Sequence, residues 1–152
     1  MTNRKKLISI VTPVYNEEDT LEQYYARVSG VMDTLSDTYD FEIVMTDNCS
    51  TDQTFANLEK LVAKDSRIRV FRFSKNFGYQ KSIWFGYYKT KGDVALELDV
   101  DLQDPPEMLE EMLEHWNKGH KIVYGIRKDR QEGFVIKNLR KIAGKIFTNI
   151  FQ

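Results

Sequence analysis

Short runs of apolar residues alternate with longer amphipathic segments along this chain. The short runs are rich in valine and isoleucine and end at turn-forming residues, which is typical of buried strands. A repeated alternation of strands and helices favours a mostly parallel sheet with helices on both faces. The expected strands are Leu7–Val14, Phe41–Thr46, Arg67–Phe73, Val94–Leu98 and Ile122–Tyr124.

The longer segments begin and end at residues that commonly start and stop helices. Asn16 can cap the first segment, whose first turn is acidic. Gly92 suits the end of the third helix. Asp104 can cap the fourth helix, whose first two positions are prolines, where a missing backbone N–H costs little. The expected helices are Glu17–Leu35, a second from Thr51 or Asp52 to Lys64, Tyr79–Lys91 and Pro105–Lys118.

The order of these elements predicts an α/β domain with three layers, helix, sheet and helix. In open parallel sheets, ligands bind outside the carboxyl ends of the strands. A binding site is therefore expected in the loops that follow Val14, Thr46, Phe73, Leu98 and Tyr124.

The composition fits one globular domain. The chain has 152 residues, of which 41% are hydrophobic and 30% are charged, with a formal net charge of -1. A single cysteine, Cys49, excludes an intramolecular disulfide and suits a reducing compartment. No apolar run approaches the length of roughly 18 residues that spans a bilayer. The short apolar stretch near the N-terminus also does not resemble a signal peptide.

The charge is unevenly distributed along the chain. Residues 127–152 carry seven Lys or Arg and two Asp or Glu. Residues 1–126 carry 15 Lys or Arg and 21 Asp or Glu. Residues 134–151 predict a basic amphipathic helix, which either lies on an anionic membrane surface or packs against other protein. Its apolar stripe is Leu139, Ile142, Ala143, Ile146, Phe147 and Ile150, and its basic residues are Lys137, Arg140, Lys141 and Lys145.

Acidic residues follow the fourth expected strand directly. Asp99 and Asp101 are two positions apart, so an extended backbone places them on the same side. Two close carboxylates repel each other unless a cation lies between them, and oxygen ligands suit Mg²⁺ or Mn²⁺. Gln103 can add a neutral oxygen, and a nucleotide diphosphate can complete the coordination. The alternative is a solvated acidic loop.

Two further loops end at the same edge of the expected sheet. In the segment TPVYNEED, Pro13 ends a strand, Tyr15 offers a ring for a nucleobase, and Glu17 can accept hydrogen bonds from ribose or base. In the segment TDNCSTDQT, Asp47 can accept a hydrogen bond from a ring N–H of the base. Each segment alone is also explained as a turn that begins a helix. The chain contains no P-loop and no glycine-rich dinucleotide motif after the first strand.

Taken together, these stretches resemble the family 2 inverting glycosyltransferases with the A-type fold. The similar segments are SIVTPVYNEEDTL, EIVMTDNCSTDQT, FSKNFGYQKS, KGDVALELDVDLQDPPE and VYGIRKDR, in family order. The most similar subgroup is the polyprenyl-phosphate sugar transferases, which include dolichol-phosphate mannose synthases and bactoprenol glucosyltransferases. The resemblance implies a Rossmann-like sheet with a nucleotide-sugar-binding domain over residues 1–130.

The resemblance also assigns roles to individual residues. It implies that four residues, named at the end of this paragraph, hold the nucleoside. It also implies that Asp99, Asp101 and Gln103 hold a Mg²⁺ or Mn²⁺ ion with the diphosphate. Arg127 would approach a phosphate, and Asp101 and Arg127 would be the catalytic residues. The chain departs from the family where a second Asp and a Gly often follow Asp47. The four nucleoside residues are Pro13, Tyr15, Glu17 and Asp47.

The implied reaction is the inverting transfer of a sugar from a UDP- or GDP-sugar to a polyprenyl phosphate, within cell-envelope polysaccharide synthesis. The acceptor phosphate is already an anion, so the reaction needs no strong general base. We expect residues 131–152 to start a C-terminal portion that the chain lacks and to contact a membrane at its cytoplasmic face. No nucleic-acid partner is expected, and the oligomeric state is left open. Alternatives are a saccharide or lipopolysaccharide acceptor, or a non-catalytic fragment that binds nucleotide sugar.

Overall fold

The computed structural model describes residues 4–126, which form four strands and four helices in alternation. Arg127 and the expected basic helix of residues 131–152 lie outside the described residues. In chain order the elements are β1 (Lys6–Val14), α1 (Leu21–Thr34), β2 (Tyr39–Asp47), α2 (Thr54–Lys64), β3 (Ile68–Arg72), α3 (Tyr79–Lys89), β4 (Val94–Glu97) and α4 (Met108–Asn117).

The four strands form one parallel sheet in the order β3-β2-β1-β4. The central pair is in register from Lys6 opposite Tyr39 to Val14 opposite Asp47. This arrangement confirms the expected α/β fold. The change of direction in strand order lies between β1 and β4, where open parallel sheets commonly bind ligands.

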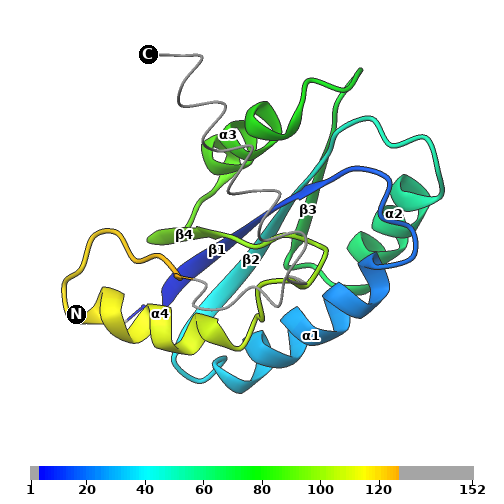
Figure 1. Ribbon diagram of the computed structural model, residues 1–152. Helices are drawn as coiled ribbons and strands as arrows, with labels where there is room; N and C mark the ends of the chain where they lie inside the picture. The colour runs from blue at the N-terminus through cyan, green and yellow to red at the C-terminus, as the bar shows by residue number, and fades with distance from the viewer. Residues whose placement is uncertain (1–3, 127–152) are drawn as a thin grey trace, which may run out of the picture.

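Helices cover both faces of this sheet, so the three expected layers are confirmed. Figure 1 shows α1, α2 and α4 on one side of the sheet and α3 on the other. The side chains of Ile8, Ile10 and Ile43 point to the first side and join the main core with α1, α2 and α4. On the second side, Gly86 of α3 lies so close to Val11 that a Cβ atom there would be 2.5 Å from Val11 Cγ1.

The predicted fifth strand, Ile122–Tyr124, is wrong. Residues 121–126 have no strand structure, and the side chains of Ile122 and Tyr124 are 83% and 75% exposed. An alternating sequence forms a strand only where another backbone offers hydrogen bonds and other side chains cover its apolar face. These residues have neither in the part of the chain that the structure describes.

The expected cap at Asn16 is also wrong. Helix α1 begins at Leu21, and Asn16 has a φ of 53°, in the left-handed region that asparagine tolerates. Its side-chain oxygen instead accepts a hydrogen bond from the backbone N–H of Thr51 at 2.8 Å. Likewise α2 begins at Thr54, because Asp52 accepts the backbone N–H of Thr54 in the preceding turn. The two loops therefore fasten to each other before either helix begins.

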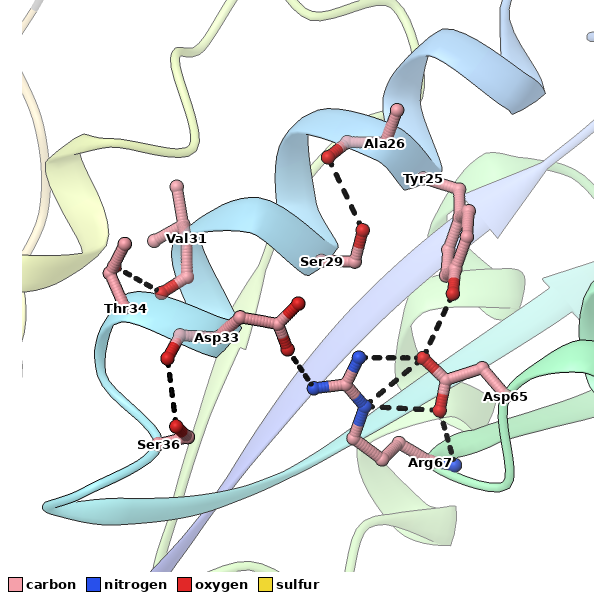
Figure 2. A network of polar contacts seen from close by, with 9 residues as sticks. All are labelled: Tyr25, Ala26, Ser29, Val31, Asp33, Thr34, Ser36, Asp65 and Arg67. Carbon is pink, nitrogen blue, oxygen red and sulfur yellow. Dashed lines mark hydrogen bonds and ion pairs between the residues drawn. The ribbon is translucent and has the colours of Figure 1, made fainter.

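A polar network ties α1 to the turn before β3 (Figure 2). Asp65 is only 8% exposed, and its carboxylate accepts hydrogen bonds from the guanidinium of Arg67 and from the hydroxyl of Tyr25. The guanidinium also reaches Asp33 at 2.8 Å. The Arg67 guanidinium holds the pKa of Asp65 below its ordinary value, more strongly than burial raises it.

None of the four helices within residues 4–126 has the length and apolar character that a membrane-spanning helix requires.

Candidate functional site

A pocket of about 360 Å³ opens at the carboxyl ends of β1 and β4, beside the first turn of α3. Its walls come from segments that are far apart in the sequence. Five residues predicted for the site are brought together here: Pro13, Tyr15, Glu17, Asp99 and Asp101. The residues that line it are Pro13, Val14, Tyr15, Glu17, Asn48, Asn76, Gly78, Tyr79, Ser82, Asp99, Val100 and Asp101.

Asp99 and Asp101 both line the pocket, although β4 ends at Glu97 and a turn begins at Val100. Leu98 and Val100 alternate with them and are buried in the core, with exposures of 6% and 2%. The chain then turns sharply at Leu102, whose φ is 56°. In that turn Asp101 accepts a hydrogen bond from the backbone N–H of Gln103 at 3.0 Å. The two aspartates thus line one pocket, as the sequence predicted, although not along a continuous strand.

The side chain of Gln103 lies differently from the two aspartates. It borders a larger neighbouring cavity of about 880 Å³ between β4 and α4, which Asp99 also borders. Most of this cavity is apolar and is lined by β4 and α4 residues such as Leu96, Met108 and Met112. Gln103 does not line the smaller pocket. It therefore lies beside the two aspartates but outside the pocket that they share.

The hydroxyl of Tyr79 joins two carboxylates at the pocket. It lies 2.8 Å from Oε1 of Glu97 and 2.8 and 3.0 Å from the two carboxylate oxygens of Asp99. Burial raises the pKa of Tyr79 above its ordinary value, and hydrogen bonds to the two acids raise it further. The hydroxyl therefore keeps its proton at neutral pH and acts as a donor to this acidic cluster.

The loop that carries Tyr15 and Glu17 is held in place by the loop after β2. The backbone N–H of Glu17 donates to Oγ1 of Thr54 at 2.7 Å, and Ser50 accepts from the preceding N–H. The Glu17 carboxylate in turn accepts from the hydroxyl of Thr20 at 2.6 Å. Tyr15 keeps 43% of its surface exposed, so its ring is accessible to a ligand.

Asp47 was predicted to contact the nucleoside, but it is fully buried and does not line this pocket. Its Oδ1 accepts the backbone N–H of Ser50 at 3.0 Å. Its Oδ2 receives no hydrogen bond from the described residues, although Nε of Arg72 lies 3.2 Å away as an ion pair. A buried carboxylate oxygen of this kind still has the capacity to accept another donor.

Asn48 is a pocket residue that the sequence analysis treated only as a departure from the family pattern. Its side chain is 96% buried and holds the loop before α3. The amide N–H donates to Asn76 at 2.8 Å, and the amide oxygen accepts the backbone N–H of Phe77 at 2.9 Å. Gly78 then adopts a φ of 89° as α3 begins, a conformation that favours glycine. The start of α3 is thereby fixed against the pocket.

The charge of the pocket has one sign. Among the described residues that line it, the charged side chains are Glu17, Asp99 and Asp101, and none is Lys, Arg or His. A group of three His, Cys, Asp or Glu side chains in metal-binding arrangement is absent from residues 4–126. Any cation held by the two aspartates would therefore complete its shell with water and with ligand oxygens, as Mg²⁺ commonly does.

Comparison with known proteins gives a consistent family assignment. The family model described as Glycosyl transferase family 2 matches residues 9–151. An uncharacterized glycosyltransferase, sll0501 of Synechocystis sp., is 35% identical over 144 residues, covering 91% of this chain and 45% of the relative. The undecaprenyl-phosphate 4-deoxy-4-formamido-L-arabinose transferase of Edwardsiella ictaluri is 32% identical over 148 residues, covering 97% and 44%. The chain thus spans less than half the length of these curated relatives.

Solved structures share the fold at low sequence identity. Residues 1–349 of TarS from S. aureus align with a TM-score of 0.63 and 23% identity, covering 82% of this chain and 39% of that one. The mannosyltransferase PcManGT from Pyrobaculum calidifontis, solved with GDP-Man and Mn²⁺, aligns with a TM-score of 0.56 and 18% identity, covering 68% and 34%. Both likenesses lie below 25% sequence identity and therefore show the fold alone.

Proposed function

This chain belongs to glycosyl transferase family 2, and on that premise we propose that its pocket binds the diphosphate of a nucleotide sugar through a divalent cation. The observation that carries the proposal is the charge of the pocket wall. Three carboxylates and no basic side chain line the described pocket, so a diphosphate alone would be repelled. A divalent cation between the acids and the phosphates removes that repulsion.

Asp99 and Asp101 are the residues that would hold this ion, since both line the pocket. Two carboxylates with substrate oxygens and water form the kind of ligand set that Mg²⁺ or Mn²⁺ prefers. When bound, the ion would neutralise the negative charge that develops on the leaving diphosphate. The structural neighbour solved with GDP-Man and Mn²⁺ supports a divalent ion in this fold.

The nucleoside would lie toward the loop after β1. The exposed ring of Tyr15 offers a stacking surface, and Glu17 offers a carboxylate for ribose or base. No hydrogen bond from residues 4–126 reaches Oδ2 of Asp47, which is ion-paired with Arg72 and would accept an N–H of the base. The first turn of α3 faces the same pocket, and its positive end favours the negative phosphates.

The acceptor we propose is a polyprenyl phosphate, and the transfer inverts the sugar. The support is the family of relatives, which includes undecaprenyl-phosphate sugar transferases. An acceptor phosphate is already anionic, so the residues need only position it and offset its charge. Arg127 would serve that purpose. A saccharide acceptor is the second candidate, and analysis of the product formed with each acceptor separates the two.

Ligand-dependent thermal unfolding tests the donor half of the proposal. We expect UDP-sugars or GDP-sugars to raise the unfolding temperature in Mn²⁺ but not in EDTA. At a ligand concentration of 100 times Kd the added stability is about 2.7 kcal/mol. Each kcal/mol corresponds to about 2–4 °C for a domain of this size. Equal stabilisation with and without metal would contradict the proposal, because the donor would then bind without a cation.

A further inference from the structure

A long stretch of the chain around α3 is basic and aromatic at once. Residues 66–92 contain seven Lys or Arg and no Asp or Glu. The same 27 residues contain eight aromatic side chains. The eight are Phe71, Phe73, Phe77, Tyr79, Trp84, Phe85, Tyr87 and Tyr88.

The side of α3 that points away from the sheet carries the most exposed of these residues. Lys81, Trp84 and Tyr88 are spaced by three and four positions and so share one helix face. Trp84 is 73% exposed and Tyr88 is 80% exposed, whereas Ile83 of the opposite face is buried. Large aromatic residues exposed together on a helix mark an interaction surface more often than a solvated one.

This surface lies over a cluster of phenylalanine rings and includes two lysines. Phe85 packs edge-on against Phe71 and Phe73 at ring-centroid distances of 5.6 and 5.1 Å, which anchors α3 on β3. The ammonium of Lys89 lies 5.1 Å from the centroid of the Tyr88 ring. We call Lys81, Trp84, Tyr88 and Lys89 the outer face of α3.

We propose that the outer face of α3 rests on an anionic lipid bilayer. Trp and Tyr side chains have an apolar body and a polar tip, and they concentrate at the boundary between headgroups and acyl chains. Lysines beside them attract the phosphates of anionic lipids. Pairing with a second copy of the same face is disfavoured, because the lysines of the two copies would meet with like charge and no acidic residue of this stretch to offset them.

The position of this face gives the contact a consequence for the site. Gly78, Tyr79 and Ser82 at the start of α3 line the acidic pocket, so the pocket lies next to the surface that meets the bilayer. This consequence rests on the proposed function, since it would bring a lipid-phosphate acceptor to the donor site. The bilayer contact itself does not depend on that function, nor on the expected helix of residues 131–152.

Tryptophan fluorescence of the full chain tests the contact directly, because the chain has two Trp residues. In Trp116→Phe the only tryptophan is Trp84, and we expect its emission to shift to shorter wavelength when phosphatidylglycerol vesicles are added. In the matched variant Trp84→Phe, the emission of the half-buried Trp116 should not change. Co-sedimentation with the vesicles while the emission of Trp84 stays constant would overturn the proposal, since other residues would then make the contact.

Charge reversal provides an independent readout by co-sedimentation without any nucleotide sugar. Lys81→Glu should weaken binding to phosphatidylglycerol vesicles by about fivefold or more, the factor that one basic residue contributes near an anionic surface. The control Lys60→Glu reverses an exposed charge on α2 and should bind like the original chain. Equal losses in both variants, or a shift of Trp84 emission on concentrating the protein without vesicles, would refute the bilayer contact. Both measurements omit the donor, so failure of the proposed function would leave them unaffected.

Discussion

At the scale of single residues, the acidic pocket depends on how one hydroxyl is shared. The Tyr79 hydroxyl has one proton but lies within hydrogen-bonding distance of three oxygens, one on Glu97 and two on Asp99. A hydrogen bond to a charged acceptor is stronger than one between neutral groups. Tyr79 therefore limits the orientations of Asp99 before any ligand binds.

We predict that Tyr79→Phe weakens metal-dependent nucleotide binding, because the Asp99 carboxylate then loses the group that orients it. For a half-exposed hydrogen bond to a charged group we expect a cost of about 1 kcal/mol, or about a fivefold rise in Kd. Titration calorimetry in Mn²⁺ measures the change. Tyr88→Phe removes an equivalent hydroxyl outside the pocket and should leave Kd as it is. An unchanged Kd in Tyr79→Phe would mean that the hydroxyl does not position Asp99.

At the scale of elements, α3 reaches its place beside the pocket by close packing on β1. Gly86 faces the fully buried Val11, and the distance to a built Cβ leaves no room for a methyl group. Val11 is β-branched and lies on a central strand, so it has little freedom to move aside. The separation between α3 and the sheet is thus determined by the absence of a side chain.

Gly86→Ala should therefore destabilise the protein by about 1–3 kcal/mol, the usual cost of overpacking a core. Gly30→Ala is the matched control, because Gly30 lies within α1 and has no atom within 4 Å of its built Cβ. There alanine should stabilise by about 0.5–1 kcal/mol through its helix propensity. Urea unfolding measures both. A neutral Gly86→Ala would show that α3 packs less closely than described.

The contact between Asp65 and Arg67 predicts that the free energy of unfolding depends on pH. The pKa of Asp65 is held below its ordinary value by Arg67, so its contribution to stability is present above the unfolded pKa of about 3.9. That contribution is lost as the pH falls through the lower pKa of the folded state. Asp65→Asn should cost about 2 kcal/mol at pH 7, and the difference from the original chain should shrink as the pH falls below the unfolded pKa of about 3.9.

Urea unfolding of both proteins across this pH range gives the difference directly. Glu114→Gln is the control, since Glu114 forms an exposed pair with Lys118 at 3.7 Å and should change stability by less than about 0.5 kcal/mol. A cost for Asp65→Asn that persists undiminished at low pH would show that the effect is one of shape and not of charge.

At the scale of the whole molecule, the sequence predicted the architecture because strand and helix periodicity are local properties. It also predicted that Asp99 and Asp101 lie close together after the fourth strand, and both line the same pocket. The helix starts near Asn16 and Asp52 were misplaced, because each side chain also accepts a hydrogen bond from the other loop. Asn16 accepts the backbone N–H of Thr51, and Asp52 accepts that of Glu18 at 3.4 Å. The contact between Tyr79 and Asp99 was missed because it joins segments that are 20 residues apart and forms only when α3 packs on the sheet.

The distribution of charge over the molecule unites the two proposals. An acidic pocket lies at the start of α3, and a basic, aromatic face runs along the outside of the same helix. Neither feature follows from the net charge of -1. The acidic pocket suits a cation with phosphates, and the basic face suits an anionic surface. Arg127 and residues 131–152 stay predictions from the sequence.

The central claim is that Asp99 and Asp101 bind a donor diphosphate through a divalent cation, and calorimetric titration of UDP or GDP with and without Mn²⁺ tests it most directly. We predict binding to the original chain only in Mn²⁺, and its loss in Asp101→Asn. Asp37→Asn makes the same chemical change at an exposed turn before β2 and should bind like the original chain. Binding by Asp101→Asn with unchanged affinity and metal dependence would contradict the account.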